Sequence, residues 1–378
     1  MPRLTAKFFV TPVYPYGKDR YYHEIVALAE GFQELGHRVI GNVNYWQIPE
    51  VSSYLIPEDD ESDFDIAVYD YRYVTSFAHL LFRHGYPNFR KDRPHILLDR
   101  NDWISPIWLD KPYERFELIA SGNLYRNVKY RRNMRPWAMG LTSRIMRAID
   151  RFYKEDEPQD PVIGSNSRTD NNVRSRLHAA LSEQSKCYPL KPCLSSGHAG
   201  WKADAKDPDY IYWKQTTERH DPDYFHALNR HLLFSAICGY FEYRPLLYQP
   251  YSFLDKIRRR PFIWGSKIAN GLGLDEASKQ FLFQHDSFRF YEVLYSRACP
   301  IQIDLQDWNF WMPAMPADGA HYLGIKRFDV RGLADRLAGM SPQEISEIGR
   351  KGRMFAKDHY SPAAQAARLL EYLKETTS

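Results

Sequence analysis

The order strand, helix, strand at the start of the chain is the feature that most constrains the fold. Residues 6–13 form an apolar run that a Tyr-Pro-Tyr-Gly segment ends, and residues 19–35 carry apolar side chains at helical spacing. Gly36 follows this helix, and an apolar strand begins at His37. Strands joined by a connection as long as a helix pair in parallel. The pattern therefore predicts a βαβ unit within a parallel sheet.

The alternation of strands and helices continues and then starts again after a charged, proline-containing segment at residues 154–161. That segment has no apolar face, so we interpret it as the connection between two domains. Strands are expected at residues 63–69, 94–98, 161–165 and 300–303, and helices at residues 77–84, 144–153, 173–181, 286–297 and 361–376. A helix followed by a strand is expected within residues 223–240, and a capping box of Ser341 and Glu344 starts another helix. The sequence predicts an α/β protein with two Rossmann-like domains that face each other across a cleft.

The composition fits two globular domains and restricts the partners. The chain has 378 residues, of which 44% are hydrophobic and 26% charged. A net charge of +4 argues only weakly for a nucleic acid or a membrane. The four cysteines lie far apart and have no zinc-binding spacing. Cys238 and Cys299 lie in apolar runs typical of buried thiols, and this use of cysteine suits a reducing cytoplasm. The first apolar run is too short for a signal peptide, and no run is long enough to span a membrane.

A candidate anion site follows the first strand of the second half. Ser165 ends that strand, and small polar residues then lead through Arg168 into a helix with Arg174 and Arg176. Backbone N–H groups at the start of a helix bind anions, and arginine adds bidentate hydrogen bonds. The segment predicts a phosphate or diphosphate site. The alternative interpretation is a capped helix with solvated arginines.

A second candidate lies on the helix expected at residues 286–297. This helix begins near Ser287 and carries Arg289 and Glu292 before it runs into an apolar strand. A carboxylate at Glu292 could accept two hydrogen bonds from the diol of a ribose. The alternative is that Glu292 only complements the positive end of the helix dipole.

Acidic residues at the strand ends of the first half are candidates for a general base. Asp70, Asp99 and Asp102 follow predicted strands, and Trp103 beside them could stack on a sugar. Each of these acids could instead form a buried ion pair with a neighbouring arginine. His23 on the first helix is a further candidate base, although a single histidine on a helix is more often a partly buried polar residue.

The loop after the first strand is the expected acceptor-binding segment, with Tyr14, Tyr16 and Gly17. No metal site is expected. The Asp-x-Asp pairs at residues 63–65 and 221–223 precede a strand and start a helix, so we interpret them as surface or capping carboxylates.

A basic segment from Arg126 to Arg151 contains one acidic residue and several apolar ones, including Trp137, Leu141 and Ile145. Such a segment could lie on an anionic membrane surface, where lipid-linked sugar acceptors occur. The alternative is the solvated basic face of a helix.

The segment Arg289-Phe-Tyr-Glu292, followed by Ala298-Cys-Pro-Ile301, resembles the RxxE…GCIPV segment of exostosin-like glycosyltransferases with the GT-B fold. In that family the glutamate binds the ribose of the donor. The segments at residues 164–176 and 224–238 are similar to the phosphate-facing turn of these enzymes and to the element before their donor loop. The opening of the chain and the helix at residues 361–376 are also similar to GT-B enzymes, in which the final helix often crosses back to the first domain.

The sequence departs from the pattern at three positions. Retaining GT-B enzymes carry two glutamates eight residues apart, and Gln284 stands where the first would be, which favours an inverting enzyme. Arg297 and Ala298 replace the small residue and glycine that precede the strand in the family.

The resemblance implies three segments: an acceptor-binding domain at residues 1–155, a donor-binding domain at residues 156–360 and a helix at residues 361–378 that packs on the first domain. It implies a hexosyl- or pentosyltransferase that is inverting and independent of metals, with a nucleotide sugar as co-substrate and no other cofactor. Lys267 would join the arginines at residues 168–176 in stabilising the departing diphosphate.

The implied acceptor is a carbohydrate or a lipid-linked sugar in glycan or polysaccharide synthesis. The expected location is the cytoplasm, with peripheral contact at the inner face of the membrane through residues 126–151. Three alternatives stay open: a glycosyltransferase that modifies a nucleic-acid base, a protein that binds a nucleotide sugar without catalysis, and an epimerase with two Rossmann-like domains.

Overall fold

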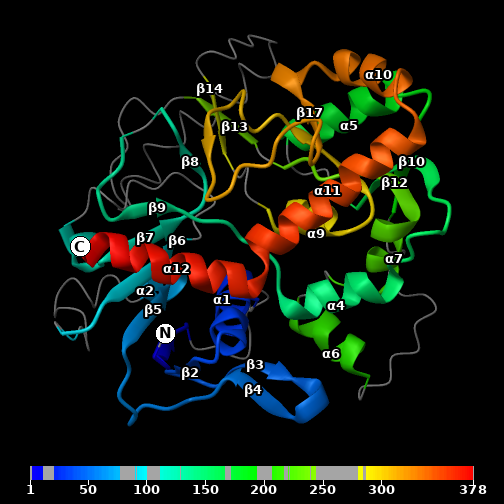
Figure 1. The fold of residues 1–378 in the computed structure, drawn as a ribbon. Helices are drawn as coiled ribbons and strands as arrows, with labels where there is room; N and C mark the ends of the chain where they lie inside the picture. Colours follow the sequence, from blue (N-terminus) through cyan, green and yellow to red (C-terminus); the bar gives the residue numbers. More distant parts are fainter. Residues whose placement is uncertain are drawn as a thin grey trace.

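Two parallel sheets, each flanked by helices, form the framework of the chain (Figure 1). The computed structural model describes residues 2–11, 21–76, 90, 92–99, 111–127, 129–166, 172–193, 207–216, 220, 222–238, 240–243, 280–283 and 287–377. The helix expected at residues 77–84 lies outside this part of the chain.

The first sheet has six parallel strands in the order β2-β1-β5-β6-β7-β9. These strands are β1 (Thr5–Phe9), β2 (Arg38–Gly41), β5 (Ile66–Asp70), β6 (His95–Asp99), β7 (Leu118–Ser121) and β9 (Met134–Pro136). Helix α1 (His23–Glu34) joins β1 to β2 and buries Ile25, Leu28 and Phe32 completely, as their spacing predicts. The short helix α2 (Tyr71–Ser76) follows β5.

The second sheet has five parallel strands in the order β11-β10-β12-β15-β17. Its strands are β10 (Asp160–Ser165), β11 (Leu190–Pro192), β12 (His231–Ser235), β15 (Cys299–Ile303) and β17 (Leu323–Ile325). The helices of this half are α5 (Asn172–Gln184), α7 (Pro222–Arg230), α9 (Phe288–Tyr295), α10 (Val330–Ala338) and α11 (Pro342–Tyr360). The predicted capping box of Ser341 and Glu344 is present at the start of α11, and Cys238 and Cys299 are buried as expected.

Smaller elements complete the described fold. Three antiparallel strand pairs are β3 (Tyr45–Ile48) with β4 (Ser53–Ile56), β8 (Leu124–Tyr125) with β16 (Phe310–Trp311), and β13 (Tyr240–Tyr243) with β14 (Gln280–Phe283). Helix α6 (Pro208–Gln215) and the 3-10 helices η1 (Pro49–Val51), η3 (Lys111–Arg115) and η5 (Lys326–Phe328) lie between larger elements. The β8–β16 pair joins the first half of the chain to the second.

Helix α4 (Ser143–Phe152) packs against the second half of the chain. It contacts α7 and α9, and its Ile145 and Ile149 are fully buried in the core that surrounds the second sheet. Its first turn also touches the first half, because the backbone N–H of Ser143 donates to Glu30 of α1 over 2.6 Å. Helix α4 therefore lies at the junction of the two halves.

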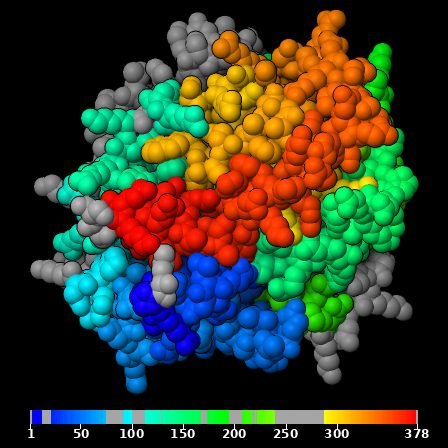
Figure 2. Space-filling view, viewed as in Figure 1, coloured from blue at the N-terminus to red at the C-terminus, as the bar shows by residue number. Residues whose placement is uncertain are grey.

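Helix α12 (Pro362–Thr377) crosses back to the first half, as expected (Figure 1). It runs beside α1, and its Ala366, Leu369, Leu370 and Leu373 complete the core of the first sheet. In Figure 2 this helix, in red, fills the space between the blue surface of the first half and the orange and yellow surface of the second. The structure confirms the predicted α/β fold with two Rossmann-like halves.

The apolar residues of the basic segment face the core. Met134, Trp137, Leu141 and Ile145 are each at most 5% exposed. These four side chains are not at the surface, and contact of the segment with a lipid bilayer stays a prediction. Among the described helices, none is long and apolar enough to cross a membrane.

Gly31 allows α1 and α12 to approach closely. A Cβ atom at Gly31 would lie 2.0 Å from the backbone oxygen of Pro362, a distance that backbone atoms cannot tolerate. The crossing of the two helices thus depends on the missing side chain at this position.

We expect Gly31→Ala to lower the free energy of unfolding by about 1–3 kcal/mol, because α12 must move away from α1. The measurement is urea denaturation. Gly339→Ala is the matched control, since a Cβ there would make only ordinary contacts, 3.6 Å from Arg336. Equal stability of the two variants would contradict the role given to Gly31.

Candidate functional site

Such folds bind ligands at the carboxyl ends of their parallel strands, and polar side chains lie at these ends in both sheets. In the first sheet β5 and β6 end at Asp70 and Asp99. In the second sheet β10 and β12 end at Ser165 and Ser235. All four residues are buried, at no more than 8% exposure.

Two arginines and a histidine gather at the end of β12. His178 of α5 lies 2.7 Å through Nε2 from the hydroxyl of Ser235, and the Nε atom of Arg174 donates to the carbonyl of Ile237 over 3.0 Å. Burial, together with the charges of Arg174 and Arg289, lowers the pKa of His178 to about 4. The bond to Ile237 places Arg174 at this strand end, and the charge of Arg289 also acts on His178 there. The geometry offers positive charge beside a neutral imidazole, a setting suited to an anionic group.

Glu292 is completely buried one helical turn after Arg289. The hydroxyl of Tyr224 donates to its Oε2 atom over 2.6 Å, and the Nε2 atom of His220 lies 2.8 Å from its Oε1 atom. Tyr224 also receives a hydrogen bond from Arg289. Glu292 thus holds two partners and connects through Tyr224 to the arginine at the strand end.

His220 connects Glu292 to α4. A guanidinium N–H of Arg144 donates to Nδ1 of His220 over 2.5 Å, and arginine has no acceptor. The proton of the neutral imidazole therefore resides on Nε2, the atom that faces Glu292. Arg144 is itself buried and also lies over the ring of Tyr212, 5.0 Å from its centroid.

The first half contributes Tyr21 and His23 to the same place. His23 is 3% exposed, and its Nε2 atom lies 2.9 Å from the carbonyl of Gly140, which can only accept. Its Nδ1 atom then accepts from the hydroxyl of Tyr21 over 2.8 Å. The ring of His23 stacks on Phe288 of α9. His23 could act as a base only if its hydrogen bond to Gly140 or to Tyr21 broke.

The carboxyl group of Glu292 is ionised throughout the physiological range. Burial alone would raise its pKa, but the adjacent His220 and the hydrogen bond of Tyr224 outweigh burial and lower the pKa to about 2. Burial lowers the pKa of His220 to about 4, against the attraction of Glu292. Near neutral pH the pair is a buried carboxylate beside a neutral imidazole.

Asp99 lines a small hollow at the carboxyl edge of the first sheet. Its neighbours in the wall include Glu24, Asn123 and Trp137, and its Oδ2 atom accepts from the hydroxyl of Ser121 over 2.7 Å. Asp70 is fully buried and accepts from the backbone N–H of Arg72 over 3.0 Å. Of these two predicted bases, Asp99 is the one that borders a hollow.

Several predicted site residues are not placed. Tyr14, Tyr16, Gly17, Asp102, Trp103, Arg168, Lys267 and Gln284 lie outside the described residues. Ser287 precedes the first turn of α9 without a capping bond from its side chain, and Arg176 is exposed on α5. The predicted roles of these residues stay predictions.

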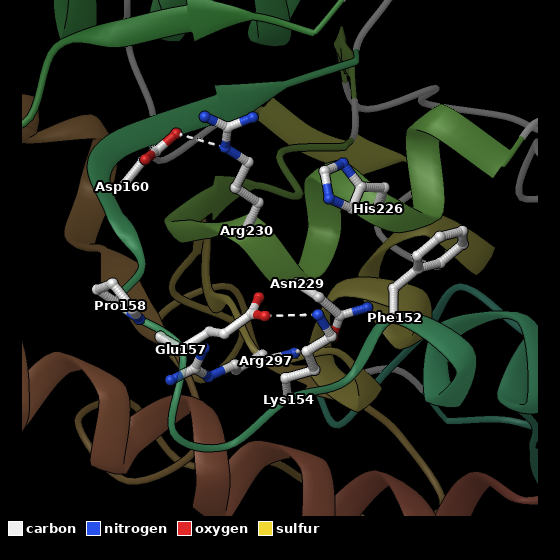
Figure 3. Close-up of a pocket in the computed structure, with 9 residues that line it drawn as sticks. All are labelled: Phe152, Lys154, Glu157, Pro158, Asp160, His226, Asn229, Arg230 and Arg297. Atoms are coloured by element: carbon white, nitrogen blue, oxygen red, sulfur yellow. Dashed lines mark hydrogen bonds and ion pairs between the residues drawn. The ribbon is translucent and has the colours of Figure 1, made fainter.

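A separate hollow of about 400 Å³ lies at the opposite, amino-terminal end of the second sheet (Figure 3). Its wall includes Lys154, Glu157, Asp160, Arg230 and Arg297. Arg230 pairs with Asp160 and Lys154 with Glu157, while Arg297 donates to backbone carbonyls of the segment between the two halves. These charges fix that segment to the second half.

The fold is that of known glycosyltransferases. No protein-family model matches the chain, and no curated protein sequence matches it. An alpha-glucosyltransferase solved in complex with UDP-glucose and DNA containing an abasic site has a TM-score of 0.52 and 8% identity, over 98% of this chain and 99% of that chain. A glycosyltransferase from Rickettsia africae ESF-5 has a TM-score of 0.52 and 10% identity, over the whole of both chains. At such identities the likeness shows the fold, which is GT-B.

The partners of Glu292 are not among the site residues that the sequence predicts. His220 lies in a segment that has no helical or strand pattern. Arg144 is one of many basic residues in its own segment, and nothing in its type sets it apart from them. The apolar residues Leu141, Ile145 and Ile149 recur every fourth position, which is typical of a buried helix face and could have placed Arg144 beside the core.

We expect acid to destabilise the chain partly through His178. Its pKa in the folded state is below the usual 6.5, so between about pH 6.5 and 4 only the unfolded chain gains this proton, and stability falls as pH falls. Each such group contributes a slope of up to about 1.4 kcal/mol per pH unit. His178→Gln keeps a donor to Ser235 without titrating there, so its stability should fall less steeply.

Urea denaturation of both proteins between pH 4.5 and 7 measures the difference in slope. Groups common to both, such as Glu30 with its pKa raised to about 7 by burial, cancel in the comparison. Parallel pH curves would contradict the assignment of His178.

Proposed function

We propose that the chain is a glycosyltransferase that moves a sugar from a nucleotide-sugar donor to a hydroxyl group of an acceptor. The likeness of fold to two glycosyltransferases, over almost the whole chain, supports this class. One of them was solved with UDP-glucose, so a uridine diphosphate sugar is the first donor to test.

The observation that carries the proposal is the pair Arg174 and Arg289 at the end of β12. Both charges act on His178, which burial keeps neutral, so they face an uncharged imidazole at this strand end. In the reaction the bond between the anomeric carbon and the diphosphate breaks, and negative charge develops on the leaving oxygen. Two positive side chains held in a partly buried place would stabilise that charge. Ser165, Ser287, Arg176, Arg168 and Lys267 complete the proposed donor site.

The proposal also includes Glu292, which would bind the ribose of the donor as the corresponding glutamate does in exostosin-like enzymes. In this structure its side chain is 1% exposed and both oxygens face protein partners. A ribose diol could therefore reach it only by replacing the contact of Tyr224 or of His220. Its other proposed role is to accept the hydrogen bond of the Tyr224 hydroxyl, which in turn receives a hydrogen bond from Arg289.

Asp99 is the proposed base on the acceptor side. The acceptor oxygen attacks the anomeric carbon, and its proton passes to a carboxylate on the first half. Asp99 borders a small hollow at the edge of the first sheet, whereas Asp70 is fully buried. Asp102 and His23 are the remaining candidates, and Tyr14, Tyr16, Gly17 and Trp103 the proposed acceptor contacts.

The finer parts of the proposal come from the resemblance. Transfer is proposed to be inverting, because Gln284 replaces a glutamate of retaining enzymes, and independent of a metal or other cofactor. The proposed role is glycan or polysaccharide synthesis at the cytoplasmic face of a membrane. The anomeric configuration of the product, read by NMR, tests the stereochemistry.

A second candidate is glycosyl transfer to a base of DNA. The solved glucosyltransferase with DNA favours it, together with the exposed basic side chains Arg126, Lys129 and Arg132. An assay that offers both duplex DNA and saccharides as acceptors decides between the two candidates. Transfer of the sugar to DNA and to no saccharide would overturn the proposal of a saccharide acceptor.

We expect one of UDP, GDP, CMP and dTDP, or its sugar derivative, to raise the melting temperature of the chain. A ligand at a hundred times its dissociation constant adds about 2.7 kcal/mol of stability. Arg174→Ala should bind the same nucleotide at least about tenfold more weakly, since it loses a charge-assisted contact to phosphate.

Arg230→Ala is the matched control for a lost arginine, because Arg230 pairs with Asp160 at the opposite end of the sheet. Its nucleotide affinity should equal that of the wild type. Absence of stabilisation by any nucleotide would overturn the proposed donor class.

We expect Asp99→Asn to lower kcat by about 10²–10⁴-fold while nucleotide affinity stays unchanged, since general-base catalysis contributes about that factor. Turnover is measured as release of the nucleoside diphosphate from the donor identified above. Asp160→Asn, which removes a carboxylate far from the site, should turn over normally. Normal turnover by Asp99→Asn would exclude Asp99 as the base.

A further inference from the structure

We propose that His220 is a positioning residue of the donor site, which links helix α4 at the junction of the two halves to Arg289 through Glu292 and Tyr224. This inference rests on the proposed function, since it assigns Arg289 to the donor phosphates. It adds a coupling between the first half of the chain and the phosphate site of the second.

The first step of the relay joins the first half to α4. Ser143, the first residue of α4, donates through its backbone N–H to Glu30 over 2.6 Å and through its hydroxyl to Glu34 over 2.5 Å. Both acceptors belong to α1. The start of α4 is thereby tied to the first half, and a displacement of α1 would move it.

The second step passes from α4 to Glu292. Arg144 is the next residue along α4, and it is 6% exposed. Its guanidinium donates to Nδ1 of His220, which places the ring proton on Nε2, and this atom lies 2.8 Å from Oε1 of Glu292 as a close polar contact without the angle of a hydrogen bond. Because arginine can only donate, Nδ1 of His220 must accept, and the ring proton of His220 lies on the side of the carboxylate.

The third step leads from Glu292 to the phosphate site. Its Oε2 atom accepts the hydroxyl proton of Tyr224 over 2.6 Å, so the oxygen of Tyr224 has lone pairs left to receive a hydrogen bond from Arg289. The charge of Arg289 also acts on His178, whose Nε2 atom contacts Ser235 at the end of β12. Loss of any member leaves a buried polar group without its partner, so the relay should hold one arrangement.

The rings around His220 restrict it to this arrangement. Tyr21 of the first half meets it edge to face at 5.8 Å between centroids, and Phe288 of α9 does so at 5.7 Å. Phe288 also stacks on His23, which the first half supplies. A change in the distance between the halves would therefore reach His220 both through Arg144 and through its packing.

The test measures binding of inorganic pyrophosphate to the full chain by calorimetry, in wild type, His220→Phe, His220→Gln, Arg289→Ala and the double variant His220→Phe/Arg289→Ala. Pyrophosphate represents the diphosphate without assuming a base or a sugar. We expect His220→Phe to bind at least about tenfold more weakly, and His220→Gln, whose amide can donate to Glu292, to recover most of the affinity. The double variant should bind no more weakly than Arg289→Ala alone, because His220 acts through Arg289.

Tyr224→Phe provides the same test if His220→Phe does not fold, because it removes the hydroxyl between Glu292 and Arg289 and leaves His220 in place. Tyr295→Phe is the matched control on α9, since its hydroxyl bonds Asp150 outside the relay. Its pyrophosphate affinity should be that of the wild type even where its stability is lower.

The outcomes separate the relay from the proposed function. Wild-type affinity in a folded Tyr224→Phe or His220→Phe, or additive losses in the double variant, overturns the relay and leaves the glycosyltransferase standing. Non-additive losses in a chain that binds pyrophosphate without turning over any nucleotide sugar support the relay and overturn the proposed activity. A wild-type chain that does not bind pyrophosphate overturns both.

Discussion

Burial of the Glu292 carboxylate is the interaction on which the junction of the two halves depends. An ionised carboxylate away from water destabilises a fold by several kcal/mol unless donors surround it. The donors come from separate elements: Tyr224 from α7, and His220 from the residues before it. His220 in turn needs Arg144 of α4, and α4 needs the acidic side chains of α1. One buried charge on α9 is therefore connected to three further helices, α7, α4 and α1, and to the loop residue His220.

The buried polar residues around Glu292 differ from the charged residues around the hollow in Figure 3. Charges around that hollow are exposed and pair with one another, so each interaction contributes little and none requires a neighbour from the first half. Around Glu292 the reverse holds: each partner is at most 6% exposed, and its removal leaves an uncompensated group. The described structure concentrates its electrostatic constraints at the carboxyl edge of the second sheet, where the proposed chemistry occurs.

The sequence predicted the parts of the fold that periodicity determines. The βαβ unit at the start, the strands that end at Asp70 and Asp99, the helix after Ser341 and the final helix all follow from local spacing, and the structure confirms them. Glu292 and Arg289 could be singled out because one helix carries both. Their connection to His220 and Arg144 could not, because it joins residues far apart in the chain. The burial of Leu141 and Ile145 was not expected from their place among arginines: both pack in the core, while contact of the segment with a membrane stays a prediction.

The crossing of α12 over α1 has a consequence for synthesis on the ribosome. The first half of the chain emerges early, yet its core is complete only when Leu369, Leu370 and Leu373 are available. Until then the face of α1 around Gly31 and Phe32 stays uncovered while the whole second half is translated. Domains usually fold in the order in which they are made. Here the early half must wait for the late helix, so folding of the nascent chain should end with a docking step that closes the first half last, and chaperones would meet an apolar groove in the meantime.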